Sequence, residues 1–208
     1  MSDYQDYLII LSPPESICKS IKKLKDFSAG VVGDYDSRYS TAHITIQLWP
    51  GKRPVWIEPL LPKLERELQS LPPLVAEINR FDFFNHKDTH TIYAGLNLNA
   101  QTNIWFKHLR KFFNKAKFEP HITIARSIPH ADFIKLWPHF KGKQWNEQFK
   151  IDKLTVLKRE TISYSSKYKV FKEIRFNRRL DFDTFTNSKL KAQSFPLIKA
   201  DSRQISLF

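Results

Sequence analysis

The sequence predicts an α+β fold made of two similar lobes, each with an antiparallel sheet. Two observations lead to this prediction. Short apolar runs with the two-residue period of strands alternate along the chain with amphipathic stretches of helical period. In addition, the tetrapeptide His-Ile-Thr-Ile occurs twice, at 43–46 and at 121–124, each time after a strand and a helix. The predicted order of elements is β-α-β-α-β-β-α-β-α-β-β.

The first half opens with a short apolar strand at 7–11. A helix then begins after Pro13 and Pro14, with Glu15 in its first turn, and ends near residues 29–30. The other elements of this half are a strand at 43–49, which Pro50 and Gly51 end, and a helix at 56–71 with prolines near its start.

The second half is predicted to contain two strand pairs, two helices and the second motif strand. These elements lie at 74–84 and 91–98 (strand pair), 103–114 (helix), 121–125 (strand), 131–140 (helix) and 149–158 with 168–177 (closing pair). Residues 1–180 are therefore predicted to form a single bilobal domain, with the lobe boundary near 80–90 and strands that can exchange between lobes. Residues 181–208 have no sustained period and are expected to form a basic tail.

Composition predicts the cellular compartment and the class of binding partner. The 208 residues carry a net charge of +13, which favours a polyanionic partner such as nucleic acid. The single cysteine, Cys18, excludes an intrachain disulfide framework and suits the cytoplasm. The first residues do not have the pattern of a signal peptide, and no apolar stretch has the length of a membrane span, so no membrane partner is expected.

The repeated tetrapeptide has a chemical meaning if both copies are strands. Side chains alternate between the faces of a strand, so His43 and Thr45 share one face, as do His121 and Thr123. If the two strands face each other across a cleft, one histidine can accept a proton from an attacking oxygen while the other donates a proton to the leaving oxygen. The threonine hydroxyls can then donate to the non-bridging oxygens of a phosphate. This chemistry requires no metal or cofactor.

These paired motifs, with Pro120 before the second and Arg126 after it, resemble the 2H phosphoesterase superfamily. The likeness is to its bacterial 2′-5′ RNA ligase and RNA 2′,3′-cyclic phosphodiesterase branch. The resemblance covers about residues 5–177 and implies a pseudo-twofold fold with two antiparallel sheets facing a central cleft and helices outside. It also implies a metal-independent phosphodiesterase that acts on 2′,3′-cyclic phosphate or 2′-5′-linked RNA or nucleotides, with ligation as the reverse reaction. By analogy, His43 and His121 are the acid and the base, in an order that the sequence leaves open.

Other residues are weaker candidates for substrate binding. Strict alternation from His121 places Arg126 on the opposite face, so it reaches the cleft only if the strand ends or twists there. Tyr35 and Tyr39 lie in the loop before the first motif, where recognition residues are common. A metal site at His86 and His90 is disfavoured because the two residues bracket a turn and have no third ligand nearby; they are expected to be exposed.

The alternative function is a nucleic-acid-binding module or a repair-associated factor. The last five residues resemble the short peptide with which bacterial replication and repair proteins dock on the DNA sliding clamp. Its anchors here are Gln204, Ile205, Leu207 and Phe208. Clamp docking is compatible with the enzyme function, so the clamp is a second expected partner beside RNA or nucleotides.

Overall fold

The computed structural model describes residues 4–113, 119–161 and 167–177, and its strands form two four-stranded sheets. The first sheet, here sheet A, has the order β2-β1-β7-β8 and antiparallel neighbours throughout. Its strands are β1 (Gln5–Leu11), β2 (Ile44–Lys52), β7 (Lys153–Glu160) and β8 (Lys169–Arg175). Sheet A therefore combines the first two strands of the chain with the last two described strands.

The second sheet, sheet B, has the order β5-β4-β3-β6 and is also antiparallel. Its strands are β3 (Leu74–Asn85), β4 (Thr89–Leu96), β5 (His121–Pro129) and β6 (Glu147–Ile151). The two sheets together account for the predicted pair of antiparallel sheets. Both HITI tetrapeptides are at edge strands: His43 directly precedes β2 of sheet A, and His121 begins β5 of sheet B.

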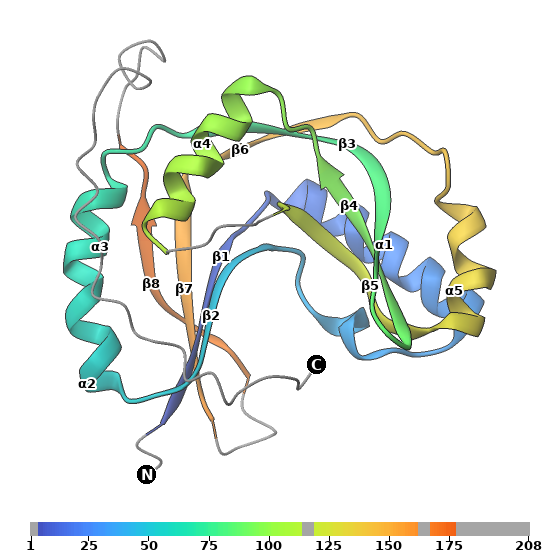
Figure 1. The fold of residues 1–208 in the computed structure, drawn as a ribbon, viewed down its shortest axis with the longest axis horizontal. Coiled ribbons are helices and arrows are strands. Elements are labelled where there is room, and N and C mark those ends of the chain that lie inside the picture. Colours follow the sequence, from blue (N-terminus) through green and yellow to red (C-terminus); the bar gives the residue numbers. More distant parts are fainter. Residues whose placement is uncertain (1–3, 114–118, 162–166, 178–208) are drawn as a thin grey trace.

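Helices cover the outer sides of the sheets (Figure 1). Helices α1 and α5 pack against each other and against β5, while α3 packs against β8 and α4 against β3. The helical segments are α1 (Glu15–Val32), η1 (Asp36–Tyr39), α2 (Pro54–Ile57), η2 (Glu58–Leu60), α3 (Leu61–Leu68), α4 (Ala100–Lys111), α5 (His130–Leu136) and η3 (Trp137–His139).

Three predicted elements differ from the structure for identifiable reasons. The helix predicted at 56–71 is broken into α2, η2 and α3, because Pro59 and Pro62 cannot donate helical hydrogen bonds. The strand predicted to stop at Pro50 continues to Lys52, since an edge strand tolerates a proline that points its missing donor away from the ladder. The helix expected to end near residue 30 continues to Val32 and ends at Gly33, whose φ of 83° suits glycine.

The largest difference is in the strand predicted at 149–158. It is two strands, β6 and β7, which meet at Asp152 and belong to different sheets. The predicted lobe boundary near 80–90 falls within the β3–β4 hairpin of sheet B, so neither sheet corresponds to one half of the chain. The division into a domain over 1–180 and a tail over 181–208 stays a prediction, and residues 178–208 lie outside the described part.

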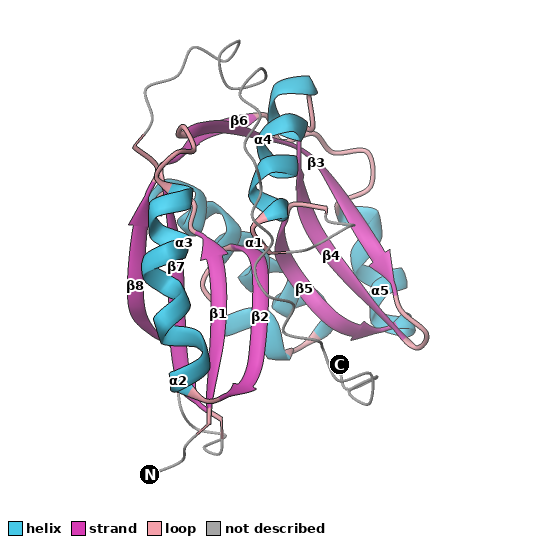
Figure 2. Ribbon diagram, turned by 60° about the vertical axis from the view of Figure 1, so that its left-hand side comes forward, coloured by secondary structure: helices cyan, strands magenta, loops and turns pink. Residues whose placement is uncertain are grey.

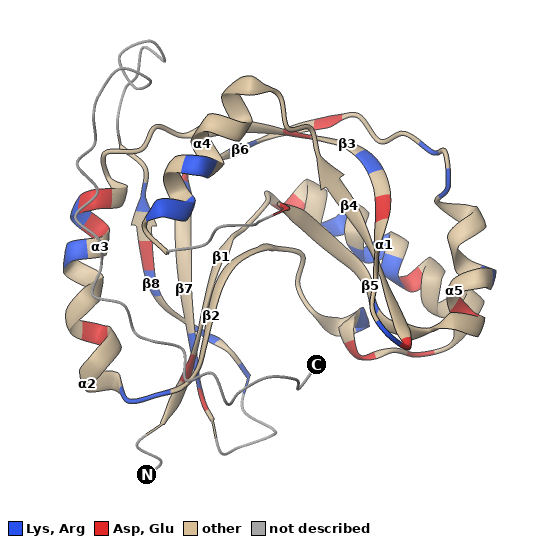
Figure 3. Ribbon diagram, viewed as in Figure 1, with Lys and Arg blue, Asp and Glu red and all other residues tan. Residues whose placement is uncertain are grey.

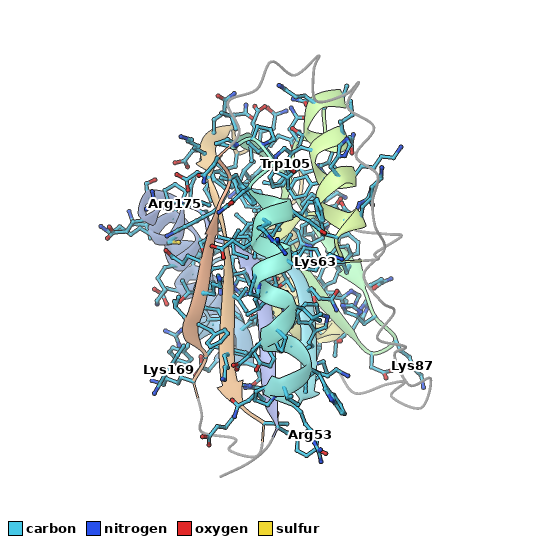
Figure 4. The ribbon with its side chains drawn as sticks, turned by 90° about the vertical axis from the view of Figure 1, so that its left-hand side faces the viewer. Arg53, Lys63, Lys87, Trp105, Lys169 and Arg175 are labelled. Carbon is cyan, nitrogen blue, oxygen red and sulfur yellow. The ribbon has the colours of Figure 1, made fainter. Side chains whose placement is uncertain are left out.

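Charged side chains are spread over the outer elements. In Figure 3, Lys and Arg occur on α1, α3, α4 and β8, and few lie on β1, β2 or β4. Figure 4 shows Lys87 and Arg53 projecting at the periphery of the molecule, while Trp105 of α4 lies inside. Of the described helices, none combines the length and apolar character needed to cross a bilayer.

We expect Trp105 to be a large single contributor to stability. Its side chain is fully buried, its indole Nε1 donates to the Pro72 carbonyl at 2.8 Å, and its ring packs edge-on against Phe176. Trp105→Ala should lower the free energy of unfolding by about 3–5 kcal/mol, because it leaves a cavity and an unpaired carbonyl. Urea denaturation measures this, with Trp56→Ala as the control because Trp56 is 57% exposed. Equal losses in the two variants would contradict this description of the core.

Candidate active site

The two HITI strands lie next to each other although they belong to different sheets. β2 is the edge of sheet A and β5 is the edge of sheet B, and the two strands are in contact. Figure 2 shows these two edge strands side by side, where the two sheets meet. The structure therefore brings together two tetrapeptides that are far apart in the sequence.

The apolar and polar positions of each motif separate as strand alternation predicts. The four isoleucines are 3% exposed or less and belong to the core: Ile44, Ile46, Ile122 and Ile124. The histidines and threonines are half-buried on the other side of their strands, which we term the motif face.

Both histidines are held in the same way. The carbonyl oxygen of Thr41 accepts a hydrogen bond from Nδ1 of His43 at 2.7 Å, and that of Glu119 accepts one from Nδ1 of His121 at 2.7 Å. A carbonyl oxygen can only accept, so Nδ1 carries the hydrogen in both rings. Nε2 is therefore the nitrogen of each ring that can take up or release a proton.

Each motif strand also contains a β-bulge at its fourth motif residue. On β5, Thr123 pairs with Tyr93 and Ala125 pairs with the adjacent residue of β4, so Ile124 is the extra residue. On β2, the same comparison with β1 identifies Ile46 as the extra residue. The bulges occupy equivalent positions, which extends the repeat beyond the four identical residues.

The bulge decides the orientation of Arg126. Ile124 and Ala125 are consecutive and both fully buried, so the alternation slips by one and Arg126 is exposed on the same side as His121. Strict alternation predicted the opposite face. After burial, the positive charge of Arg126 is among the causes that lower the pKa of both histidines.

Burial is the main cause of the lowered pKa of both histidines, and nearby charges make the two unequal. For His43, Arg126, Lys25 and His121 lower the pKa further, against the raising effect of the Thr41 hydrogen bond. For His121, Arg126 lowers it and Glu119 raises it, through both its carbonyl and its carboxylate. Among these causes, only His121 has a neighbouring negative charge, that of Glu119, which favours the protonated ring.

Aromatic rings and a hydrogen-bonded carboxylate surround His121. The rings of Phe84 and Tyr93 lie 4.9 and 5.0 Å from its ring centre and stack on each other at 4.4 Å. Glu119 Oε1 accepts from the Tyr93 hydroxyl at 3.0 Å and from Arg80 at 2.8 Å. This network fixes Glu119 beside the ring that its own carbonyl orients.

The repeat also identifies a residue that motif reasoning missed. Leu48 lies five residues after His43, as Arg126 lies five residues after His121, and both follow an equivalent bulge. Leu48 is 45% exposed and pairs with Leu8 of β1. The row of paired apolar residues extends across sheet A through Leu157 of β7 to Val170 of β8. The motif face is thus apolar on the sheet A side and cationic at Arg126 on the sheet B side.

The tyrosines predicted to bind substrate have different surroundings. Tyr35 is half-buried, and its single hydroxyl hydrogen is shared between the carbonyls of Lys25 at 3.0 Å and Ile124 at 3.2 Å. Tyr39 is 71% exposed and its hydroxyl donates to Asp34 at 3.0 Å. Substrate contact by either residue stays a prediction.

The histidines expected to be exposed at the β3–β4 turn are not both exposed. His90 is only 6% exposed, and its Nε2 forms a 2.8 Å hydrogen bond with Nδ1 of His130. His86 is exposed, and its Nε2 forms a 3.2 Å hydrogen bond with the Thr91 hydroxyl. Within the described residues, no group of three or more His, Cys, Asp or Glu has an arrangement that holds a metal.

The clamp-docking residues Gln204, Ile205, Leu207 and Phe208 lie outside the described part of the chain.

Known proteins resemble this chain in sequence. A sequence model of the 2′-5′ RNA ligase superfamily matches residues 13–162. A candidate phosphoesterase of Geobacillus kaustophilus is 25% identical over 157 residues, which cover 73% of this chain and 86% of that protein. One from Geobacillus thermodenitrificans is 26% identical over 161 residues, with the same two coverages of 73% and 86%.

Solved structures agree on the fold. The crystal structure of TT0787 of Thermus thermophilus has a TM-score of 0.61 at 12% identity and covers 84% of this chain and 100% of its own. LigT of E. coli complexed with 3′-AMP has a TM-score of 0.57 at 13% identity, covering 84% of this chain and 99% of its own. The family match, together with the two neighbouring HITI strands, shows that this chain belongs to the 2′-5′ RNA ligase superfamily of 2H phosphoesterases.

Proposed function

We propose that this protein is a phosphodiesterase that acts on RNA or nucleotides with a 2′,3′-cyclic phosphate or a 2′-5′ linkage. The observation that carries the proposal is the pair of identically held histidines, on adjacent edge strands, each with Nε2 as the nitrogen that can exchange a proton. LigT, which shares the fold, has been crystallised with 3′-AMP, ATP and NADP+. Those ligands support a substrate of the nucleotide class.

In the proposed reaction, His43 Nε2 takes a proton from the attacking water as its oxygen bonds to phosphorus. The bond from phosphorus to the leaving ribose oxygen breaks, and His121 Nε2 gives that oxygen a proton. This assignment follows from Glu119, which favours a protonated His121, and from Arg126 and Lys25, which favour a neutral His43. With a ribose 5′-hydroxyl in place of water, the same two proton transfers on a 2′,3′-cyclic phosphate form the bond from that oxygen to phosphorus and break the bond to O3′, which gives a 2′-5′ linkage.

The remaining residues of the motif face stabilise charge on the phosphate in this proposal. The hydroxyls of Thr45 and Thr123 donate to the non-bridging oxygens, and Arg126 supplies a positive charge on the same face. These groups act where negative charge develops in the transition state, so they contribute more to kcat than to binding. No step uses a metal, and hydrolysis is expected to continue in EDTA.

The test is a panel of substrates resolved by product identity, run in EDTA with the His43→Ala, His121→Ala double variant as the blank. It compares 2′,3′-cyclic mononucleotides, RNA with a cyclic phosphate end, 2′-5′-linked dinucleotides, cyclic dinucleotides and ADP-ribose cyclic phosphate. Turnover of one class, absent from the blank, supports the proposal. Salt-dependent RNA binding without any product would instead favour the binding module.

The pH dependence is expected to show the lowered pKa values of the two histidines. Catalysis needs one neutral and one protonated ring. Because the pKa of both histidines is lowered from the ordinary value of 6.5, the ring that acts as the acid already loses its proton at a pH below 6.5. The kcat/KM of the wild type should therefore peak on the acidic side of 6.5 and fall as the pH rises through it. A bound phosphate raises the pKa of both rings, so the kcat profile should lie at higher pH. A kcat/KM optimum well above 6.5 would contradict this electrostatic description.

Recruitment to the sliding clamp through Gln204, Ile205, Leu207 and Phe208 stays a prediction, as does the cytoplasmic location. Neither alters the chemistry at the motif face.

A further inference from the structure

One short segment touches both motif strands. It consists of residues 35–41, which include η1 and connect α1 to β2, and η1 packs against β5 (Figure 1). At one end, the carbonyl of Thr41 holds His43. Nearer its start, the segment reaches across to the other sheet. We term residues 35–41 the bridging segment.

The bridging segment binds β5 at its bulge. The Tyr35 hydroxyl donates to the carbonyl of Ile124 at 3.2 Å, and the amide of Arg126 donates to the Ser37 hydroxyl at 2.9 Å. Ile124 is the bulged residue, where the ladder with β4 is interrupted and backbone groups need other partners. Side chains of the bridging segment thus form hydrogen bonds with the backbone on both sides of Ala125, next to the bulge that orients Arg126.

Lys25 of α1 holds the bridging segment from the helix side. Its side chain is only 1% exposed, and its ammonium donates to the carbonyl of Ser37 at 2.8 Å and to the carbonyl and hydroxyl of Ser40 at 2.7 and 2.8 Å. An ammonium has three hydrogens, so these contacts use all of them. All three acceptors are uncharged, and burying a charge among uncharged groups is costly. A buried lysine of this kind is a candidate for a functional role.

We propose that Lys25 is a positioning residue, which locks the bridging segment against the β5 bulge and thereby keeps Arg126 beside His43 and His121. The inference rests on the proposed phosphodiesterase function for its effect on catalysis, but the positioning itself is independent of any substrate. The three hydrogens of its ammonium all go to Ser37 and Ser40, so Lys25 acts on His121 through Ser37 and Arg126, while its charge also acts directly on His43.

The charge state of Lys25 then links the site to alkaline pH. Burial, Arg126 and Lys22 lower the pKa of Lys25 to about 8, with Cys18 acting in the opposite direction. Above this pH the amine keeps two hydrogens for three acceptors, and the bridging segment loosens, so activity falls. The free energy of unfolding should instead rise with pH between about 8 and 10.5, because over this range Lys25 binds more protons in the unfolded chain than in the folded one. Activity and folding stability should therefore diverge over this range.

The test is an NMR titration of His121 in the substrate-free protein, with Lys25→Met as the variant. Arg126 lowers the pKa of His121, and Lys25 is not among the groups that act on His121 directly. If Lys25 positions Arg126, its replacement raises the pKa of His121. Lys22→Met is the matched control, since Lys22 lies one turn earlier on α1, is half-exposed and pairs with Asp26 at the surface. This control should leave His121 unchanged.

The kinetic readout is kcat and KM on the substrate that the panel selects. Lys25→Met should lower kcat by about 10-fold or more with a smaller change in KM, because Arg126 acts on transition-state charge. Lys22→Met should keep the wild-type kcat. If the wild type turns over no phosphodiester, the proposed function fails while the His121 titration still decides the positioning role.

A Lys25→Met protein in which His121 titrates as in the wild type overturns the inference. If that variant does not fold, Ser37→Ala takes its place, because it removes only the acceptor of the Arg126 amide. Ser37→Ala should also raise the pKa of His121, and an unchanged His121 in this variant is equally decisive against the inference.

Discussion

Replacing His121 by alanine should lower kcat for hydrolysis of a 2′,3′-cyclic phosphate by about 10²–10⁴-fold, the usual contribution of one positioned general acid or base. The same loss is expected for His43→Ala, because each ring offers only its Nε2 to the reaction and neither can replace the other. The measurement is steady-state kinetics with each single variant and the double variant. The double variant should be little worse than either single variant, since the two rings act as a couple.

His139→Ala is the control for these variants. His139 is exposed in η3, outside both motif strands, and its ring contacts Phe27 of α1. It should retain wild-type kcat. If His43→Ala and His139→Ala are equally active, the proton-transfer assignment is wrong, whatever the family of the chain.

The second large effect is expected for Arg126→Ala. Removing a preorganised positive charge from the site of developing phosphate charge should lower kcat/KM by about 10²–10³-fold. The same change should raise the pKa of both His43 and His121, because Arg126 lowers the two values. The pH profile of the residual activity should therefore move to higher pH.

Two variants make the Arg126 result interpretable. Arg126→Lys keeps the charge and should preserve the pH profile while losing part of kcat/KM, since an ammonium cannot make the paired contacts of a guanidinium. Arg175→Ala removes an exposed cation from β8 at the opposite edge of sheet A and should change neither quantity. A loss of activity in Arg126→Ala with an unshifted profile would place Arg126 too far from the histidines for the proposed role.

Much of the fold follows from local patterns along the chain. The short apolar run of β1, the alternation of β5 and the helical spacing of Ile17 and Ile21 predict their elements. The histidine–threonine pattern predicts which side of each motif strand carries the chemistry. Some signals were present but weak. The buried positions move from Phe149 and Ile151 to Leu154 and Val156, and this change of phase marks the passage from β6 to β7.

Lys25 shows how a local pattern can mislead. It lies four residues after Ile21 and three before Ser28, on the buried stripe of α1, where an apolar residue is expected. From the sequence alone, Lys25 would be grouped with the other lysines of this basic helix and placed on its solvated face. Only the bridging segment, which supplies three oxygen acceptors from the next part of the chain, makes its burial possible.

The sequence alone determined that two strands each present a histidine and a threonine on one face, because side-chain alternation is a property of the local backbone. It did not determine that these strands are adjacent edges of different sheets, or that Arg126 shares their face. Adjacency depends on pairing between distant strands, and the orientation of Arg126 depends on one extra residue in the register of β5 against β4. Register is set by the partner strand and by the packing of both faces, so it becomes visible only in the folded molecule.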